Sequence, residues 1–282
     1  MSTSNKIPAP GKGGKQSKKD FVYANKAQTS IYLEQACEQN PYIASSNFLH
    51  GYDVLELIQK KSFVNVLLLL FTGELPAQHN VQLLERLMIA LLNLGPRHPA
   101  VKASMVAGVS KANVEHLLPI GLSVLGGAAN GAKEVEQAML FIQRYSHQAV
   151  NDVHQELGIE RLDNDHGEMH VCPGFGSHYG GIDVFALKIV STIIADNADI
   201  EQYKYISWAQ TFAQSLAQYD MGWLKTGIAA AVFCELGIGA RESVGLFQLI
   251  CAPGIFAHGV EQTHKPITAI PMLSDEQHIY KP

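Results

Sequence analysis

Residues 80–96 read NVQLLERLMIALLNLGP, and this stretch sets the class of the fold. Its apolar side chains recur at intervals of three and four residues, the period of one buried face of an α-helix. That face consists of Val81, Leu84, Leu87, Met88, Leu91 and Leu94. The Gly95-Pro96 pair is a typical stop, because glycine caps a helix and proline cannot continue it. The stretch therefore predicts an amphipathic helix from Asn80 to Leu94.

The same period runs through most of the chain, whereas the alternation typical of β-strands is nearly absent. One short strand is predicted near Met169–Val171. Further helices are predicted over Asp53–Lys60, Ser62–Thr72, Val101–Ser110, Val114–Val124, Lys133–Tyr145, Asp183–Ile194, Ile206–Ala217, Leu224–Leu236 and Val244–Ile250. We therefore predict an all-α fold.

Two segments stand out from this pattern. Leu224–Leu236 is apolar on nearly every side, which predicts a helix deep in a core or at a subunit interface. The region from Gln148 to Gly181 is the least periodic and is dense in His, Asp and Gly. Long polar loops in compact proteins are usually functional or disordered.

Composition limits the class of protein. The 282 residues are 47% apolar and 17% charged, enough for one large core or two coupled domains. The net charge of −5 argues against a partner with a phosphate backbone, so no nucleic acid is expected. The four cysteines form no CxxC motif, which favours free thiols in a reducing compartment, the cytoplasm.

The amino terminus and the most apolar run both favour a soluble protein. Residues 1–20 contain five lysines and no hydrophobic run for a signal peptide, so we predict a flexible, solvated tail. A basic tail of this kind could also contact an acidic partner. The run VNVLLLLF at 64–71 is too short to cross a bilayer, and no membrane association is expected.

Two glycine-rich stretches are candidates for ligand binding. VCPGFGSHYGGIDVFA (171–186) has more glycine than a packing segment needs, which suggests that a ligand approaches its backbone. LGGAANGA (125–132) precedes a helix, whose free N–H groups could receive an anion. Neither stretch carries a GxGxxG or GxxxxGK nucleotide motif.

The polar residues between these stretches allow several interpretations. A metal hypothesis groups His166, His170, Cys172 and His178. Their spacing matches no established zinc pattern, so no metal is predicted. Asp220, in QYDMGW, is interpreted either as the N-cap of the next helix or as a general base in a cleft.

Six segments in order resemble the citrate synthase and citryl-CoA lyase superfamily, over about residues 50–265. The segments are GYDVLELIQKKSFVNVLLLLFTGELP (51–76), HPAV (98–101), LSVLGGAAN (122–130), PGFGSHYGGID (173–183), QYDMGW (219–224) and LFQLICAPGIFAHGVEQ (246–262). The resemblance implies a homodimer with a cleft between two helical domains. The large domain would comprise 21–125 and 236–282, and the small domain 126–235.

The resemblance also implies chemistry between the α-carbon of a coenzyme A thioester and a keto acid, without a metal. Asp220 stands at the place of the base. Ser177 replaces the carbonyl-polarising histidine, and His178 follows one residue later. Leu125 and Met105 replace histidines, and Phe185 and Cys251 stand where arginines are expected. The other implied substrate contacts are His98, Gly126, Gly127, Asn130, Gly174, Phe175, Gly176 and His258.

Arginine usage supports the loss of a polycarboxylate site. The chain has five arginines, and none lies between Arg161 and Arg241 or after Arg241. Each lost oxyanion donor lowers a rate about 10²–10³-fold, so ordinary citrate synthase activity is not expected. Two readings stay open. One is a divergent acyl-CoA-dependent carbon–carbon bond-forming or -cleaving enzyme with a less acidic acceptor. The other is an inactive homodimeric scaffold or metabolite-binding protein.

Overall fold

The computed structural model describes residues 27–159, 169–194 and 203–281. The predicted tail at 1–20 and His166 of the metal hypothesis lie outside these residues. The chain divides into two units, residues 1–55 and residues 56–282.

The first unit contains an antiparallel sheet that the sequence did not predict. Strand β1 (Tyr32–Ala36) pairs with β2 (Ala44–Leu49), which pairs with β3 (Tyr52–Asp53). The turn at His50-Gly51 has positive φ at both residues, as tight hairpin turns require. All of β1 is exposed and β2 buries only Leu49, so these strands show no clean alternation of buried and exposed side chains.

The second unit is helical, which confirms the predicted fold class. Its helices, with α1 starting in the first unit, are α1 (Val54–Lys60), α2 (Phe63–Thr72), α3 (Gln78–Leu91), α4 (Pro99–Val109), α5 (Val114–Leu125), α6 (Ala132–Tyr145), α7 (Val150–Leu157), α8 (Val184–Ile194), α9 (Lys204–Ser215), α10 (Lys225–Glu235) and α11 (Ala240–Thr263). Several elements differ from expectation. Helix α3 ends at Leu91, before the predicted end at Leu94 and its Gly95-Pro96 stop. Helix α7 was not predicted, and α11 continues thirteen residues beyond the predicted end at Ile250.

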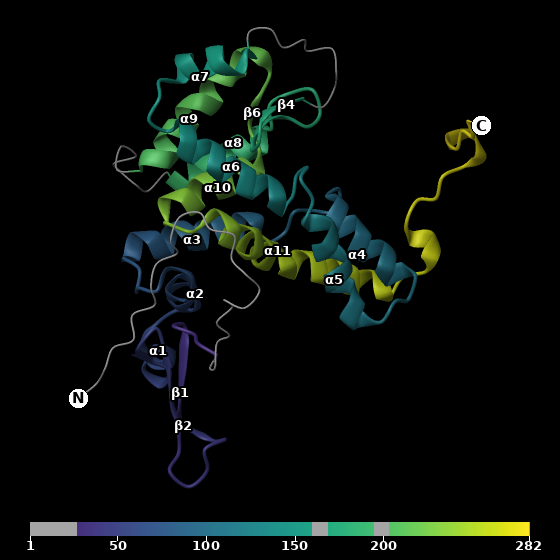
Figure 1. Cartoon of the computed structure of the whole chain (residues 1–282). Coiled ribbons are helices and arrows are strands. Elements are labelled where there is room, and N and C mark those ends of the chain that lie inside the picture. Colours follow the sequence, from purple (N-terminus) through teal and green to yellow (C-terminus); the bar gives the residue numbers. More distant parts are fainter. Residues whose placement is uncertain (1–26, 160–168, 195–202, 282) are drawn as a thin grey trace, which may run out of the picture. The chain divides into compact units, whose positions relative to one another are not determined.

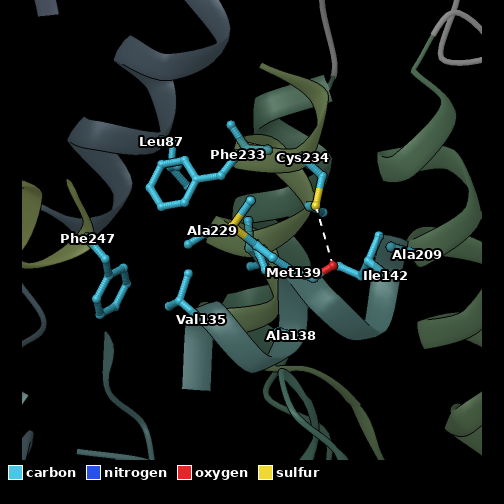
Figure 2. Close-up of a cluster of buried hydrophobic side chains, with 14 of the residues drawn as sticks. Leu87, Val135, Ala138, Met139, Ile142, Ala209, Ala229, Phe233, Cys234 and Phe247 are labelled. Carbon is cyan, nitrogen blue, oxygen red and sulfur yellow. Dashed lines mark hydrogen bonds between the residues drawn. The ribbon is translucent and has the colours of Figure 1, made fainter. Parts of the chain in front are cut away.

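The core forms where α6 and α10 pack together. Every residue of α10 from Thr226 to Cys234 is buried, which confirms that this apolar helix lies in the core. Figure 2 shows Met139 of α6 beside Phe233 and Cys234 of α10. The Cys234 thiol donates a 3.8 Å hydrogen bond to the Met139 carbonyl oxygen. Burial of such side chains supplies the main driving force for folding.

Helix α11 lies along α4 and α5 (Figure 1) and passes through Pro253 without ending. Proline removes one intrahelical hydrogen bond. The next N–H, that of Gly254, donates to the Leu92 carbonyl oxygen of a different segment at 3.0 Å. Because the Leu92 carbonyl oxygen compensates for the disturbed hydrogen bonding, the helix continues past Pro253, and the end predicted at Ile250 was too early. By length and hydropathy alone α11 could cross a membrane, although 44% of that window is buried inside the protein.

A second small antiparallel sheet brings distant segments together. Strand β4 (Met169–Cys172) pairs with β5 (Phe175–Ser177), confirming a strand near the predicted place, and β5 pairs with β6 (Gly222–Trp223). Phe175 lies opposite Trp223, and their ring centroids are 5.0 Å apart. This pairing holds the loop around Gly174 next to the segment that leads into α10.

Candidate active site

The loop between β4 and β5 packs directly on the first turn of α10. The Leu224 N–H donates to the Gly174 carbonyl oxygen at 3.0 Å. A methyl group added at Gly227 would collide with that same carbonyl, and one added at Gly174 would collide with the Gly227 backbone. Gly174 also has a φ of 82°. Both glycines are therefore required by close backbone packing, which is a different reason from the ligand approach expected at Gly174.

Glu134 joins the two glycine-rich loops. Its carboxylate accepts hydrogen bonds from the Asn130 N–H (2.6 Å) and the Gly174 N–H (3.1 Å), and the His170 Nε2 lies 3.5 Å away. The side chain is only 2% exposed. A buried carboxylate needs such donors. Sequence reasoning missed this residue, although a Glu three residues after Gly131, the N-cap of α6, is the capping-box spacing.

His98 fixes the first loop from the other side. Its Nδ1 accepts from the Ala100 N–H at 3.2 Å, so Nε2 carries the proton and donates to the Asn130 carbonyl oxygen at 2.9 Å. Burial lowers the pKa of His98, and the nearby Lys225 and His178 lower it further, while the Asn130 hydrogen bond opposes them. A neutral His98 therefore caps α4 and holds Asn130.

Basic side chains gather around this loop pair. The His170 and His178 rings lie 4.9 Å apart at their centroids. The Lys225 ammonium lies 5.9 Å from the centroid of the Phe185 ring, within cation–π range. Burial raises the pKa of Cys251 to about 12, and Lys225 acts in the opposite direction. Lys225 and the buried Thr226, whose hydroxyl has no hydrogen-bond partner among the described residues, were not singled out from the sequence.

Asp220 lies at the edge of this arrangement. It is exposed, has a left-handed φ of 56°, and ends the 3-10 helix Leu216–Tyr219. The N-cap of α10 is Leu224, so the N-cap interpretation of Asp220 was wrong, because β6 intervenes between them. A small pocket beside it is lined by Ala217 and Met221 and does not include Asp220. Since Gly222 pairs with Gly176, Asp220 lies toward the end of the sheet where Ser177 leads to His178.

The hydroxyl of Ser177 is committed to its own turn. It donates to the Gly181 carbonyl oxygen at 2.8 Å and accepts from the Gly181 N–H at 2.7 Å. The residue is 4% exposed. Both its donor and one acceptor position therefore stabilise residues 177–181.

The remaining candidates are spread over several environments. Leu125, Phe175 and Cys251 are fully buried core side chains, and Met105 packs against the same core. Gly126 and Gly127 end α5, where the Gly126 N–H donates to the Leu122 carbonyl oxygen at 3.0 Å. Gly176 lies in β5, paired with Gly222. Phe185 is exposed at the start of α8.

Two further observations concern His258 and the possibility of a metal site. His258 of α11 lies 3.2 Å from the Asn93 side-chain oxygen, measured from Nε2. No group of three His, Cys, Asp or Glu side chains suited to a metal ion occurs within residues 27–159, 169–194 and 203–281. The structure thus brings together His98, Asn130, Gly174 and His178 from the predicted set.

Solved structures resemble this arrangement of helices over nearly the whole chain. Citryl-CoA lyase from Hydrogenobacter thermophilus superposes with a TM-score of 0.70 at 21% identity, covering 91% of this chain and 94% of that one. The fold is therefore citrate synthase-like. No family model and no curated protein matches the sequence.

Two more members of this fold also match. ATP citrate lyase from Methanothrix soehngenii, in complex with citrate and coenzyme A, has a TM-score of 0.68 at 16% identity and covers 93% of this chain, which spans 44% of that one. Citrate synthase from Thermoplasma acidophilum has a TM-score of 0.56 at 15% identity, covering 78% of this chain and 59% of that one. The likeness at this identity establishes the fold.

Proposed function

We propose that this protein is a citrate synthase-like enzyme that forms or cleaves a carbon–carbon bond between a coenzyme A thioester and a weakly acidic acceptor. The observation that carries the proposal is the meeting of two glycine-rich loops at the start of α10, beside His98, His178 and Lys225. The neighbours with this fold include structures with citrate and coenzyme A, and with carboxymethyl coenzyme A and oxaloacetate.

The proposed roles follow from chemistry and position. Asp220 removes a proton from the thioester α-carbon, and the electron pair of that C–H bond moves toward the thioester oxygen. His178 donates a hydrogen bond to that oxygen or to the acceptor carbonyl. The enolate carbon then attacks the acceptor carbonyl carbon, whose oxygen gains a proton. Lys225 supplies one cation for an acceptor carboxylate, which suits a monocarboxylate better than a tricarboxylate.

Binding without chemistry is the second candidate function. It is favoured by the exposure of Asp220 and by the hydrogen bonds that occupy the Ser177 hydroxyl. General-base catalysis works best with a positioned, partly desolvated carboxylate. In this reading the chain is a scaffold that binds a metabolite.

Exchange of the α-protons of acetyl-CoA and longer thioesters in D₂O separates the two functions without knowledge of the acceptor. An enzyme is expected to catalyse exchange, and Asp220→Asn should slow it at least about 100-fold. Asp152→Asn, at an exposed position of α7, is the matched control and should leave exchange unchanged. Thioester binding measured by calorimetry, with no exchange for any thioester, would establish the scaffold instead.

We further propose the assembly that accompanies this fold: a cytoplasmic homodimer, with a large domain of 21–125 and 236–282 and a small domain of 126–235 that closes on ligand. Exposed apolar side chains on α4, α5 and α11 support an interface there, among them Val106, Ile120, Val124, Leu249 and Phe256. Light scattering coupled to size-exclusion chromatography tests the mass. A monomer at micromolar concentration contradicts this assembly.

A further inference from the structure

A pocket of about 370 Å³ lies between α3 and α8. Ligand pockets have volumes of roughly 300–1,000 Å³. From α3 it is lined by Arg86, Ile89 and Ala90. From α8 it is lined by Phe185, Lys188, Ile189, Thr192 and Ile193. Each set follows the three- and four-residue spacing of a single helical stripe, so the pocket is a groove between two facing stripes.

The described walls of this α3–α8 pocket are mostly apolar, and the charged side chains among them are cationic. The Arg86 guanidinium donates a 3.0 Å hydrogen bond to the Ile193 carbonyl oxygen, which holds it at the wall. Lys188 is the other charged residue of the lining, and within residues 27–159, 169–194 and 203–281 no carboxylate belongs to it. Lys225 adds a third cation, because its ammonium rests against the Phe185 ring.

We propose that the α3–α8 pocket binds the alkyl chain of an amphipathic monocarboxylate, with the carboxylate at Lys188 and Lys225. A small polyacid would leave the isoleucine and phenylalanine walls unfilled. A neutral chain would leave the cations without an anion. A chain of about eight carbons with one terminal charge satisfies both features, and each methylene that leaves water strengthens binding by up to about fourfold. The proposal shares Lys225 with the proposed acceptor site but does not require that the protein reacts with a thioester.

Calorimetric titration of the whole chain with acetate, hexanoate and octanoate tests the apolar part of the proposal. Affinity should rise steeply from hexanoate to octanoate, while acetate should give no measurable heat. Octan-1-ol, which has the chain without the charge, should bind at least tenfold more weakly than octanoate. Equal binding of octan-1-ol and octanoate, or no octanoate binding, overturns the proposal.

Two variants test the position of the ligand. Ile89 is 71% exposed, so Ile89→Asp should fold, and its carboxylate should weaken octanoate binding at least tenfold. Leu140→Asp, at an exposed position of α6, is the matched control and should bind like the parent. Thr192→Trp narrows the pocket without adding charge and should also weaken binding. Unchanged octanoate affinity in both pocket variants places the ligand elsewhere and refutes the site.

Removal of the cations tests the carboxylate. Lys188→Ala and Lys225→Ala should each weaken octanoate binding about tenfold and leave octan-1-ol binding unchanged. Lys204 rests on the Tyr205 ring in a similar way, 5.1 Å from its centroid, so Lys204→Ala is the control and should change neither.

Two measurements separate this site from the alternatives. If a second copy of the chain covers the pocket, Ile89→Asp will lower the mass measured by light scattering, and that result refutes the small-molecule site. If octanoyl-CoA binds and octanoate does not, the pocket is a thioester subsite and the free-carboxylate proposal fails. The rate of acetyl-CoA proton exchange should be the same in Ile89→Asp and the parent. If octanoate does not bind, the pocket proposal therefore fails while the proposed enzymatic function is unaffected.

Discussion

The two glycine-rich loops of the candidate active site are held in different ways. The loop at 126–131 is fastened by side chains, because His98 and Glu134 bind the backbone of Asn130 from two sides. The loop at 173–181 is fastened largely by backbone, through Gly174 against α10 and through the turn that Ser177 closes. Two glycine-rich loops of one site are therefore held by different kinds of contact. In the second loop, Gly174 serves packing, whereas Gly181 has no neighbour within 4 Å of an added methyl group.

The largest expected effect comes from filling the backbone contact of the second loop. Gly227→Ala places a methyl group against the Gly174 carbonyl, and a backbone atom cannot move aside as a flexible side chain can. We expect a loss of about 3 kcal/mol in the free energy of unfolding, at the upper end of overpacking effects. Chemical denaturation measures it.

Gly245→Ala is the matched control for that substitution. Gly245 lies in α11 with no atom near an added methyl group. There the change should stabilise the protein by about 0.5–1 kcal/mol, because alanine is the better helix former. If Gly227→Ala and Gly245→Ala change the free energy of unfolding equally, the second loop does not depend on close backbone packing.

The next effect concerns the residue that joins the loops. Glu134→Ala leaves the part-buried N–H of Asn130 and the buried N–H of Gly174 without their acceptor, and we expect a loss of about 2 kcal/mol in the free energy of unfolding. Glu136→Gln, which removes only a pair with Lys133 on the same helix, should cost a few tenths of a kcal/mol. Hydrogen exchange should report faster exchange at both loops in Glu134→Ala. A change confined to one loop would show that Glu134 does not couple them.

The sequence predicted best those elements whose pattern repeats within a few residues of the chain. Helices such as α6 and α10 follow from spacing within a few residues, and they were predicted to within one residue at each end. Helix α7 was missed because only Val153 and His154 are buried in it, so its apolar face is too short to be recognised in the sequence. The sheet of the first unit was missed because β1 is exposed throughout and β2 buries only Leu49, so neither strand has an alternating pattern.

The site was harder to predict because its contacts are long-range. Glu134 and Gly174 are forty residues apart, and no local pattern announces their hydrogen bond. The N-cap interpretation of Asp220 failed for the same reason, since strand pairing between Gly176 and Gly222 displaces the start of α10. The glycines of the second loop were noticed, but a packing reason and a binding reason look identical in sequence.

A smaller effect is expected from the turn of the second loop. Ser177→Ala removes both hydrogen bonds to Gly181 and should destabilise the protein by about 1 kcal/mol. Ser191→Ala removes only a bond from an exposed helical serine to the Leu187 carbonyl oxygen, and should be nearly neutral. If proton exchange of a thioester is detected, Ser177→Ala should retain it once stability is matched by temperature. Loss of exchange in a folded variant would give the hydroxyl a chemical role.

The smallest effect is a pH dependence that belongs to the first loop alone. The pKa of His98 in the folded protein lies below its ordinary value of 6.5, mainly because of burial. The unfolded chain therefore binds a proton first as the pH falls, and the stabilisation present above pH 6.5 is lost on going down through the folded pKa. Because His98 is half-buried, solvent screens part of this effect, and we expect less than about 1 kcal/mol. His98→Asn keeps a capping side chain for α4 but no titrating group, so its stability should fall less than that of the parent between pH 7.5 and 5.5. His116→Asn, at an exposed position of α5, should keep the parental slope, and a parental slope in His98→Asn would mean that neutral His98 does not hold this loop.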